Sequence, residues 1–219
     1  MGSESGWSIV KIGIILCCVF MFTGCSSVYY GAYEKVGKHK RDIMVDRVEG
    51  ARDSQAEAQE QFKSALEQFD SVVKLEETDL KKAYDSLNAE YEKSEAAATK
   101  VSDRINKVES VADDLFDEWA DELEEYQNKE LRNSSKAQLR STKSRYKEML
   151  ASMQQAESSM EPVLRIFKDN VLFLKHNLNA QAIGSLQGEF SNLKGEIDSL
   201  ITKMNAAIES SNKFIADIK

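Results

Sequence analysis

The sequence predicts an all-α protein, an elongated antiparallel four-helix bundle or coiled coil that follows an N-terminal signal segment. No glycine lies between Ala51 and Ile183, and Pro162 is the only proline in the 219 residues. Ala, Glu, Lys, Gln, Leu, Ser and Asp fill this stretch, whereas sheets would need turns every few residues. Apolar residues also recur every seven positions, which indicates helices that supercoil on one another.

Residues 1–24 are predicted to be an export signal rather than a part of the fold. Lys11 precedes an apolar run from Ile12 to Phe22. This run has about half of the roughly 20 residues that a transmembrane helix needs, so a permanent membrane span is the weaker interpretation.

The four residues at the end of this run resemble the lipobox of bacterial lipoproteins, in which Leu, a small residue, and Gly or Ala precede a cysteine. Thr23, Gly24 and Cys25 fit this pattern, and Phe22 stands where Leu is usual. The resemblance implies that Cys25 becomes the first residue of the mature chain and carries a diacylglyceryl group and a further acyl chain such as palmitate. Two or three acyl chains anchor a protein almost permanently. The alternative is ordinary secretion with a free thiol.

The residues after Cys25 are predicted to form a membrane-proximal tether, residues 25–33. An Asp after the lipidated cysteine often signals inner-membrane retention, but Ser26 stands here. The resemblance therefore implies the outer membrane, facing the periplasm. Aromatic and basic side chains near an anchor favour the headgroup region. We expect membrane contact from Tyr29, Tyr30, Tyr33, Lys35, Lys38, Lys40 and Arg41. A plain flexible tether is the alternative.

Residues 34–219 are predicted to form one helical domain. Its helices are expected at residues 34–74, 79–131, 135–176 and 180–217. The seven-residue repeat places the following residues inward: Val48, Ala51, Gln55, Ala58, Phe62, Ala65, Phe69 and Val72; Tyr84, Leu87, Tyr91, Ser94, Ala98, Val101, Ile105, Val108, Ala112, Leu115, Trp119, Glu122 and Tyr126; Leu139, Tyr146, Met149, Met153, Ala156, Met160, Val163, Phe167 and Leu174; and Ile183, Leu186, Phe190, Leu193, Ile197, Leu200, Met204, Ala207 and Phe214.

The connections between these helices are short, which favours antiparallel neighbours. Thr78 or Asp79 can cap the second helix. The run from Asn133 to Ser135 is typical of a turn that also caps the third helix, and residues 177–179 separate the third helix from the fourth. Pro162 is expected to kink or split the third helix, because it lacks a backbone donor and clashes with the preceding turn.

Opposite charges flank the predicted turn at Asn133. The second helix ends with Asp113, Asp114, Asp117, Glu118, Asp121, Glu122, Glu124 and Glu125, and the third begins with Arg132, Lys136, Arg140, Lys143, Arg145 and Lys147. Each exposed pair contributes little, but together they favour pairing of these two helices. The alternative is two independently solvated faces. The acidic group near Trp119 could also hold a cation or act in acid–base chemistry, although a solvated or partner-binding face is more usual.

Composition excludes several classes of function. The formal net charge of −8 argues against a nucleic-acid partner. Only Cys25 would remain in the mature chain beside His39 and His176, so we expect no intrachain disulfide, no metal site and no cofactor. Residues 32–39 fall short of a phosphate-binding loop, because His39 stands where Ser or Thr is needed. His176, near a helix end, is expected to complement the helix dipole.

The lipobox, the tyrosine-rich tether and the acidic helical body together resemble an uncharacterised family of proteobacterial lipoproteins, known only as a domain of unknown function. The resemblance implies no activity or catalytic residue, and no nucleophile–base pair is visible, so we expect no enzyme. We expect a membrane-anchored periplasmic lipoprotein that acts as a structural or interaction scaffold and contacts a protein partner or a second copy through its helices. The alternative is a module that binds a lipid or another small envelope ligand between the helices near Pro162.

Overall fold

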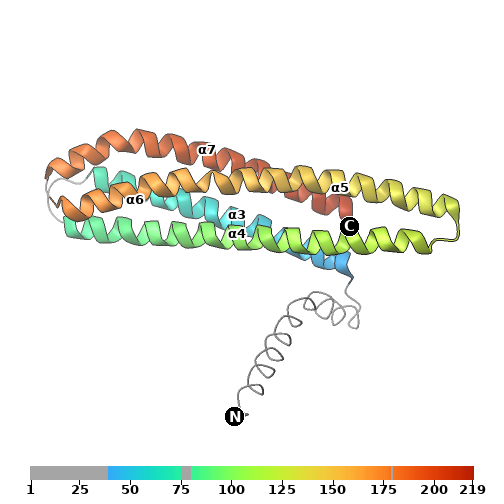
Figure 1. Cartoon of the computed structure of the whole chain (residues 1–219). Coiled ribbons are helices and arrows are strands. Elements are labelled where there is room, and N and C mark those ends of the chain that lie inside the picture. The colour runs from blue at the N-terminus through green and yellow to red at the C-terminus, as the bar shows by residue number, and fades with distance from the viewer. Residues whose placement is uncertain (1–38, 75–79, 179) are drawn as a thin grey trace, which may run out of the picture. The chain divides into compact units, whose positions relative to one another are not determined.

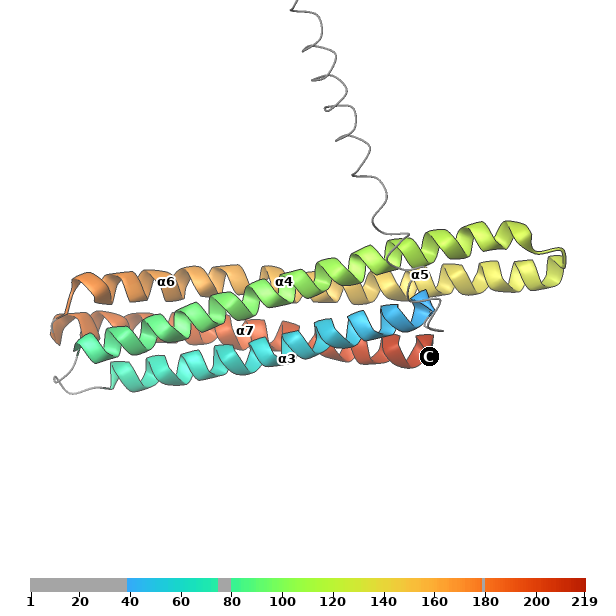
Figure 2. The ribbon, with the colours of Figure 1, turned by 90° about the horizontal axis from the view of Figure 1, so that it is seen from below.

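The computed structural model describes residues 39–74, 80–178 and 180–219. These residues form α3 (Lys40–Val73), α4 (Leu80–Glu125), α5 (Lys129–Ser158), α6 (Met160–His176) and α7 (Ala180–Ile218). The chain divides into two compact units, residues 1–42 and 43–219, and the second unit holds the bundle. No strand occurs among the described residues. The predicted all-α four-helix bundle is confirmed, and α5 and α6 together form its third rod (Figures 1 and 2).

The first and last rods of the bundle run antiparallel. Near the start of α7, the Gln187 side-chain Nε2 donates to the backbone oxygen of Val73, at the end of α3, at 2.8 Å. At the other end of α7, Lys219 Nζ pairs with the carboxylate of Glu49, near the start of α3, at 3.0 Å. The two contacts, at opposite ends of α7, show that the two helices run in opposite directions side by side.

The inward positions predicted from the repeat form most of the core. All of them are buried on α3, on α5 and on α6, and on α7 only Phe190 is half-buried rather than buried. On α4 the prediction holds along one edge as far as Leu115 and is wrong at the end of the helix, where Glu122 and Tyr126 are exposed. The buried residues there are Phe116 and Leu123. A different set of α4 side chains is buried there because this end of α4 packs only on α5, beyond the ends of α3 and α7 (Figure 2).

Aromatic rings join the helices at two levels of the bundle. Phe167 of α6 packs edge-on against Phe69 of α3 and Tyr91 of α4, with ring centroids 6.2 Å apart in both pairs. Phe69 in turn stacks on Phe190 of α7 at 6.1 Å. All four rods therefore meet at this level, where large rings supply much of the buried apolar area.

The second aromatic level lies nearer the other end. Tyr146 of α5 packs on Phe116 of α4 at 5.4 Å and on Phe214 of α7 at 6.3 Å between ring centroids. Between the two levels, the buried side chains of α5 and α6 include Met149, Met153 and Met160. Their flexible side chains suit an irregular core, as the sequence predicted.

Pro162 splits the third rod. The helix stops at Ser158 and restarts at Met160, so that Pro162 is the third residue of α6, where an amide proton is not required. The hydroxyls of Ser158 and Ser159 both donate to the backbone oxygen of Gln155, at 3.1 and 2.7 Å. The predicted break is thus confirmed, and it takes the form of two helices that continue in nearly the same direction (Figure 1).

The turn between the second and third rods lies earlier than the sequence predicted. The helices α4 and α5 are joined by residues 126–128, and Asn128 caps α5 through its side-chain oxygen, which accepts from the amides of Glu130 and Leu131. The predicted turn at Asn133 is wrong: residues 133–135 are helical. A helix start needs only one capping side chain, and Asn128 already provides it. The predicted caps Thr78 and Asp79 lie outside the described residues.

Two glutamines of α3 are buried in the core, and they differ in how well their side chains are hydrogen-bonded. Gln59 Nε2 donates to Asn205 Oδ1 of α7 at 2.8 Å. Gln55 is fully buried, and its Nε2 donates to the backbone oxygen of Met153 at a long 3.4 Å. Its Oε1 has no hydrogen-bond partner among the described residues. An unsatisfied buried oxygen costs stability, so Gln55 weakens the core.

Replacement of Gln55 by the near-isosteric Met should therefore stabilise the bundle. We expect Gln55→Met to raise the free energy of unfolding by about 1 kcal/mol, because it removes an unpaired buried oxygen and leaves no cavity. Urea denaturation followed by circular dichroism measures the change. Gln59→Met is the matched control and should bring no gain, since it breaks a well-formed bond. An unchanged or lower stability of Gln55→Met would contradict this account.

Glu90 ties α4 to α3. Its carboxylate accepts from Gln61 Nε2 of α3 at 2.7 Å and from Lys93 Nζ at 2.7 Å. Burial pushes the pKa of Glu90 upwards, but the hydrogen bonds from Lys93 and Gln61 and the charge of Lys93 outweigh it and hold the pKa below its ordinary value of 4.5. A lowered folded-state pKa contributes stability above the unfolded-state pKa, and this contribution disappears as the pH falls through the folded-state value.

We expect Glu90→Gln to destabilise the bundle by about 1 kcal/mol at pH 7, through loss of two charge-assisted hydrogen bonds. The difference from the wild-type protein should shrink below pH 4.5, because the wild-type carboxylate then becomes protonated as well. Urea titrations at pH 7 and at pH 3 test both parts. Glu92→Gln, at an exposed position two residues away, provides the control. A difference that stays constant with pH would exclude the proposed role of the Glu90 charge.

Candidate functional site

The residues predicted for lipid attachment lie outside the described part of the chain. This applies to the lipobox residues Phe22, Thr23, Gly24 and Cys25, and to the tether residues Tyr29, Tyr30, Tyr33, Lys35 and Lys38. Of the predicted membrane-contact residues, Lys40 and Arg41 are described, in the first turn of α3, where Lys40 is half-buried and Arg41 exposed. Among the described helices, none has both the length and the hydropathy to cross a membrane.

The most prominent surface feature within residues 43–219 is a projecting helical hairpin. We call residues 117–138, the end of α4, its loop and the start of α5, the tip hairpin. It continues past the end of α7 and the start of α3, so no third helix of the described residues covers it (Figures 1 and 2). Leu123 is its only buried residue. The tip hairpin is therefore exposed to solvent on nearly every side.

Two contacts hold the tip hairpin together. Trp119 Nε1 of α4 donates to Ser135 Oγ of α5 at 2.8 Å, and Arg132 Nη2 pairs with Glu124 Oε1 at 2.5 Å. Trp119 was predicted to be a core residue, and it is half-buried between the two helices. The predicted apposition of an acidic and a basic helix thus occurs. Most of its charged side chains are nevertheless exposed.

The end of the tip hairpin exposes two large apolar side chains. Tyr126, in the loop, is 40% exposed, and Leu131, in the first turn of α5, is 57% exposed. The sequence placed Tyr126 in the core, and this prediction was wrong because the helix ends at Glu125 and the repeat stops there. An exposed tyrosine is a residue type that protein-binding surfaces favour, and here it stands in the same hairpin end as an exposed leucine.

The root of the tip hairpin is packed against aromatic rings. Tyr146 of α5 is buried beside Phe116, and Lys143 Nζ lies 5.3 Å from the centre of the Phe116 ring. Burial raises the pKa of Tyr146 far above its ordinary value, and the charges of Glu109 and Asp113 raise it further. The phenol of Tyr146 therefore stays neutral at physiological pH.

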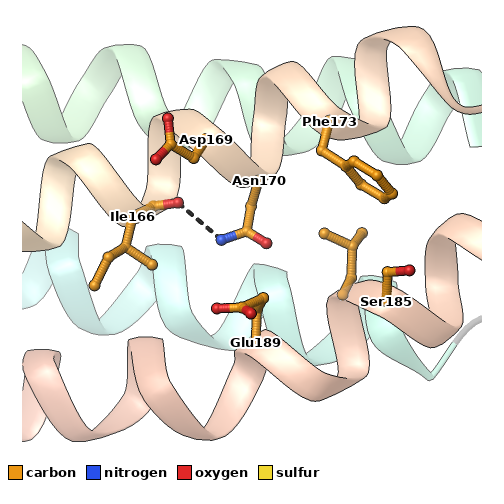
Figure 3. A pocket seen from close by; sticks show the side chains of 7 residues that line it. Ile166, Asp169, Asn170, Phe173, Ser185 and Glu189 are labelled. Atoms are coloured by element: carbon orange, nitrogen blue, oxygen red, sulfur yellow. Dashed lines mark hydrogen bonds between the residues drawn. The ribbon is translucent and has the colours of Figure 1, made fainter.

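A second surface feature lies toward the opposite end of the bundle, between α6 and α7. It is an open groove of about 470 Å³, and Figure 3 shows the side chains around it. We call it the α6–α7 groove; its lining residues are Ile166, Asp169, Asn170 and Phe173 of α6 and Ser185, Leu186 and Glu189 of α7. It begins about one turn after Pro162, in the region where the sequence placed an alternative ligand site.

The polar groups of the α6–α7 groove are mostly hydrogen-bond acceptors. Asn170 is only 6% exposed, and its Nδ2 donates to the backbone oxygen of Ile166 at 2.8 Å. Its side-chain oxygen therefore faces the space between the helices, toward which Glu189 reaches from α7 (Figure 3). Within the described ranges, neither Asp169 nor Glu189 has an ion-pair partner. The groove thus combines negative charge with an amide oxygen.

The surroundings of the α6–α7 groove are apolar on one side and open on the other. Phe173 is 39% exposed at the groove, and Leu172 and Leu178 are also exposed nearby on the chain. On α7, a side chain added at Gly184 or Gly188 would meet no atom within 4 Å. Sequence reasoning missed the groove as a specific set of residues, because its walls come from two helices whose relative rotation the repeat does not give.

No group of three or more metal-binding side chains gathers in the part of the chain that the structure describes. His176 is the exposed last residue of α6, beside Lys175, a position at which positive charge complements the helix dipole.

Comparison with known proteins gives one match. Neither a curated protein nor a solved structure matches the chain. A family model described as "Protein of unknown function (DUF2959)" matches residues 29–218, nearly all of the helical body and part of the predicted tether. The match confirms the expected membership of a domain of unknown function, and the chain belongs to the DUF2959 family.

Proposed function

We propose that the chain is a lipid-anchored lipoprotein of the bacterial envelope, held at the outer membrane through Cys25 and facing the periplasm. We further propose that it acts there as a structural or interaction scaffold and not as an enzyme. The residues from Phe22 to Cys25 support the anchor. Tyr29, Tyr30, Tyr33, Lys35, Lys38, Lys40 and Arg41 would rest against the headgroups, since aromatic rings and basic groups favour that layer.

The observation that carries the scaffold role is the tip hairpin. A bundle that needed only to be stable would gain little from a two-helix extension that buries a single leucine. The extension instead presents Tyr126 and Leu131 among exposed carboxylates and basic groups. Apolar anchors in a charged surround suit a protein partner, whose encounter the charges would steer and whose core contact the two side chains would make.

The alternative function, binding of a lipid or a small envelope ligand between the helices, has the α6–α7 groove in its favour. The groove lies in the expected region, but Asp169, Asn170 and Glu189 give it a polar and acidic wall. An acyl chain laid against these groups would desolvate them without giving a hydrogen bond in return. A lipid tail is therefore a poor fit, and a small polar ligand is the version of the alternative that the groove favours.

The anchor predicts a change of location when the thiol is lost. We expect Cys25→Ser to move the protein from the membrane fraction to the soluble periplasmic fraction, because the acyl chains supply most of the membrane affinity. Cell fractionation measures the shift, and mass spectrometry of the wild-type protein measures the mass of the added lipid. Cys18→Ser, within the predicted signal, should leave both unchanged. A wild-type protein with a bare sulfur, recovered in the soluble fraction, would refute the anchor.

The scaffold role predicts a loss of partners when the tip is made polar. We expect Tyr126→Ser combined with Leu131→Ser to reduce the recovery of protein partners from crosslinked membranes by about tenfold or more, as loss of a central contact does. Stability should change by less than about 0.5 kcal/mol per site, because both side chains are exposed.

Leu178→Ser is the matched control, since Leu178 is a similarly exposed leucine at the other end of the bundle. Differently tagged copies distinguish a second copy of the chain from a different partner. Equal recovery with the tip variant and the control would exclude the tip hairpin as the binding surface. Co-purified lipid without any protein partner would favour the alternative function.

A further inference from the structure

We infer that the α6–α7 groove binds a small organic cation, an alkylammonium or guanidinium group on a short apolar stem. The inference rests on the groove alone and holds whether or not the tip hairpin binds a partner. Three properties of the groove support it: the polarity of the atoms that it presents, the apolar surface beside them, and its size.

Among its described lining residues, the groove presents several acceptors and no cationic donor. Asp169 and Glu189 each bring a carboxylate without an ion-pair partner in the described residues. Asn170 is the more specific feature, because it is more than nine-tenths buried, one of its two N–H donors bonds the backbone oxygen of Ile166, and its side-chain oxygen has no hydrogen-bond partner among the described residues and faces the groove. The Ser185 hydroxyl donates to the backbone oxygen of Gln181 at 3.3 Å and keeps its lone pairs. A ligand must therefore supply donors and positive charge.

The apolar wall accounts for the stem of the ligand. Phe173 of α6, whose ring is exposed (Figure 3), and Leu186 of α7 both line the groove. Methylene groups can pack on the ring of Phe173, and the face of the ring attracts a nearby cation. An apolar surface beside unpaired carboxylates is the arrangement that an ammonium or guanidinium on a carbon chain would fill.

The size and charge of the groove exclude other ligand classes. A volume of about 470 Å³ lies in the range of small-molecule sites. Phosphates and carboxylates would be repelled by Asp169 and Glu189, and a purely apolar ligand would leave these groups without hydrogen bonds. A small cation satisfies both the acceptors and the apolar wall.

Calorimetric titration of the detergent-solubilised full chain tests the inference, with 1,5-diaminopentane as the probe. The neutral 1,5-pentanediol has the same carbon chain and should produce no binding heat, whereas the diamine should bind and should bind more weakly as salt is added. Glu189→Gln should weaken binding of the diamine about tenfold, as loss of a charge-assisted hydrogen bond does. Asp169→Asn tests the α6 side of the groove in the same way and should also weaken binding of the diamine.

Glu209→Gln is the matched control, because it removes the same charge from an exposed position of α7 about five turns away. All three replaced side chains are exposed, so the variants should keep the melting temperature of the wild-type protein. The inference fails if the diamine does not bind, if the diol binds equally well, or if Glu189→Gln and Glu209→Gln weaken binding to the same extent.

Discussion

The bundle depends on one constraint: each rod must bury its single apolar stripe against the other three. The aromatic contacts of Phe167 satisfy it at one level, where rings from α3, α4 and α7 surround it directly or through Phe69. Tyr146 satisfies it at the other level with rings from α4 and α7. Because α4 has 46 residues and α3 only 34, this burial cannot continue along the whole of α4. The tip hairpin is the part of α4 and α5 that extends beyond this burial, and its many charged residues suit a segment that neither α3 nor α7 covers.

The same constraint explains the features of the opposite end. Asn170 stands in α6 between Phe167 and Leu174, where the repeat would place an apolar side chain. One of its two N–H donors bonds the backbone oxygen of Ile166 within the helix, and its side-chain oxygen lies between α6 and α7. Asn170 therefore replaces an apolar side chain of the core between α6 and α7, and the α6–α7 groove lies at this position. Pro162, one turn earlier than the groove, separates this region from the regular helix α5.

Much of the fold could be predicted from the sequence because the seven-residue repeat reports burial directly. Met149, Met153 and Phe167 were placed correctly in this way. Tyr126 was not, because a repeat has no information about where its neighbours end. The turn at residues 126–128 was missed for a local reason: Asn128 and Asn133 are both good caps, and only the folded chain shows which one ends a helix.

The candidate sites were less predictable than the fold. The lipobox is a local pattern and could be found from four adjacent residues. The α6–α7 groove joins Asn170 to Glu189, which lie on different helices, and their approach depends on how the helices are rotated about their axes. The tip hairpin exists because α4 and α5 extend beyond their neighbours in the bundle. An error of a few residues in a predicted helix boundary changes this difference in length, so the sequence did not reveal it.

The glycines at the start of α7 have a consequence for motion. Gly184 and Gly188 face open space, and glycine disfavours a helix by about 1 kcal/mol relative to alanine at each such position. Neither position gains a packing contact that would offset this penalty. The amide protons of this first stretch of α7 should accordingly exchange with solvent sooner than those of the facing turns of α6. The α7 side of the groove would then open locally more often than the α6 side.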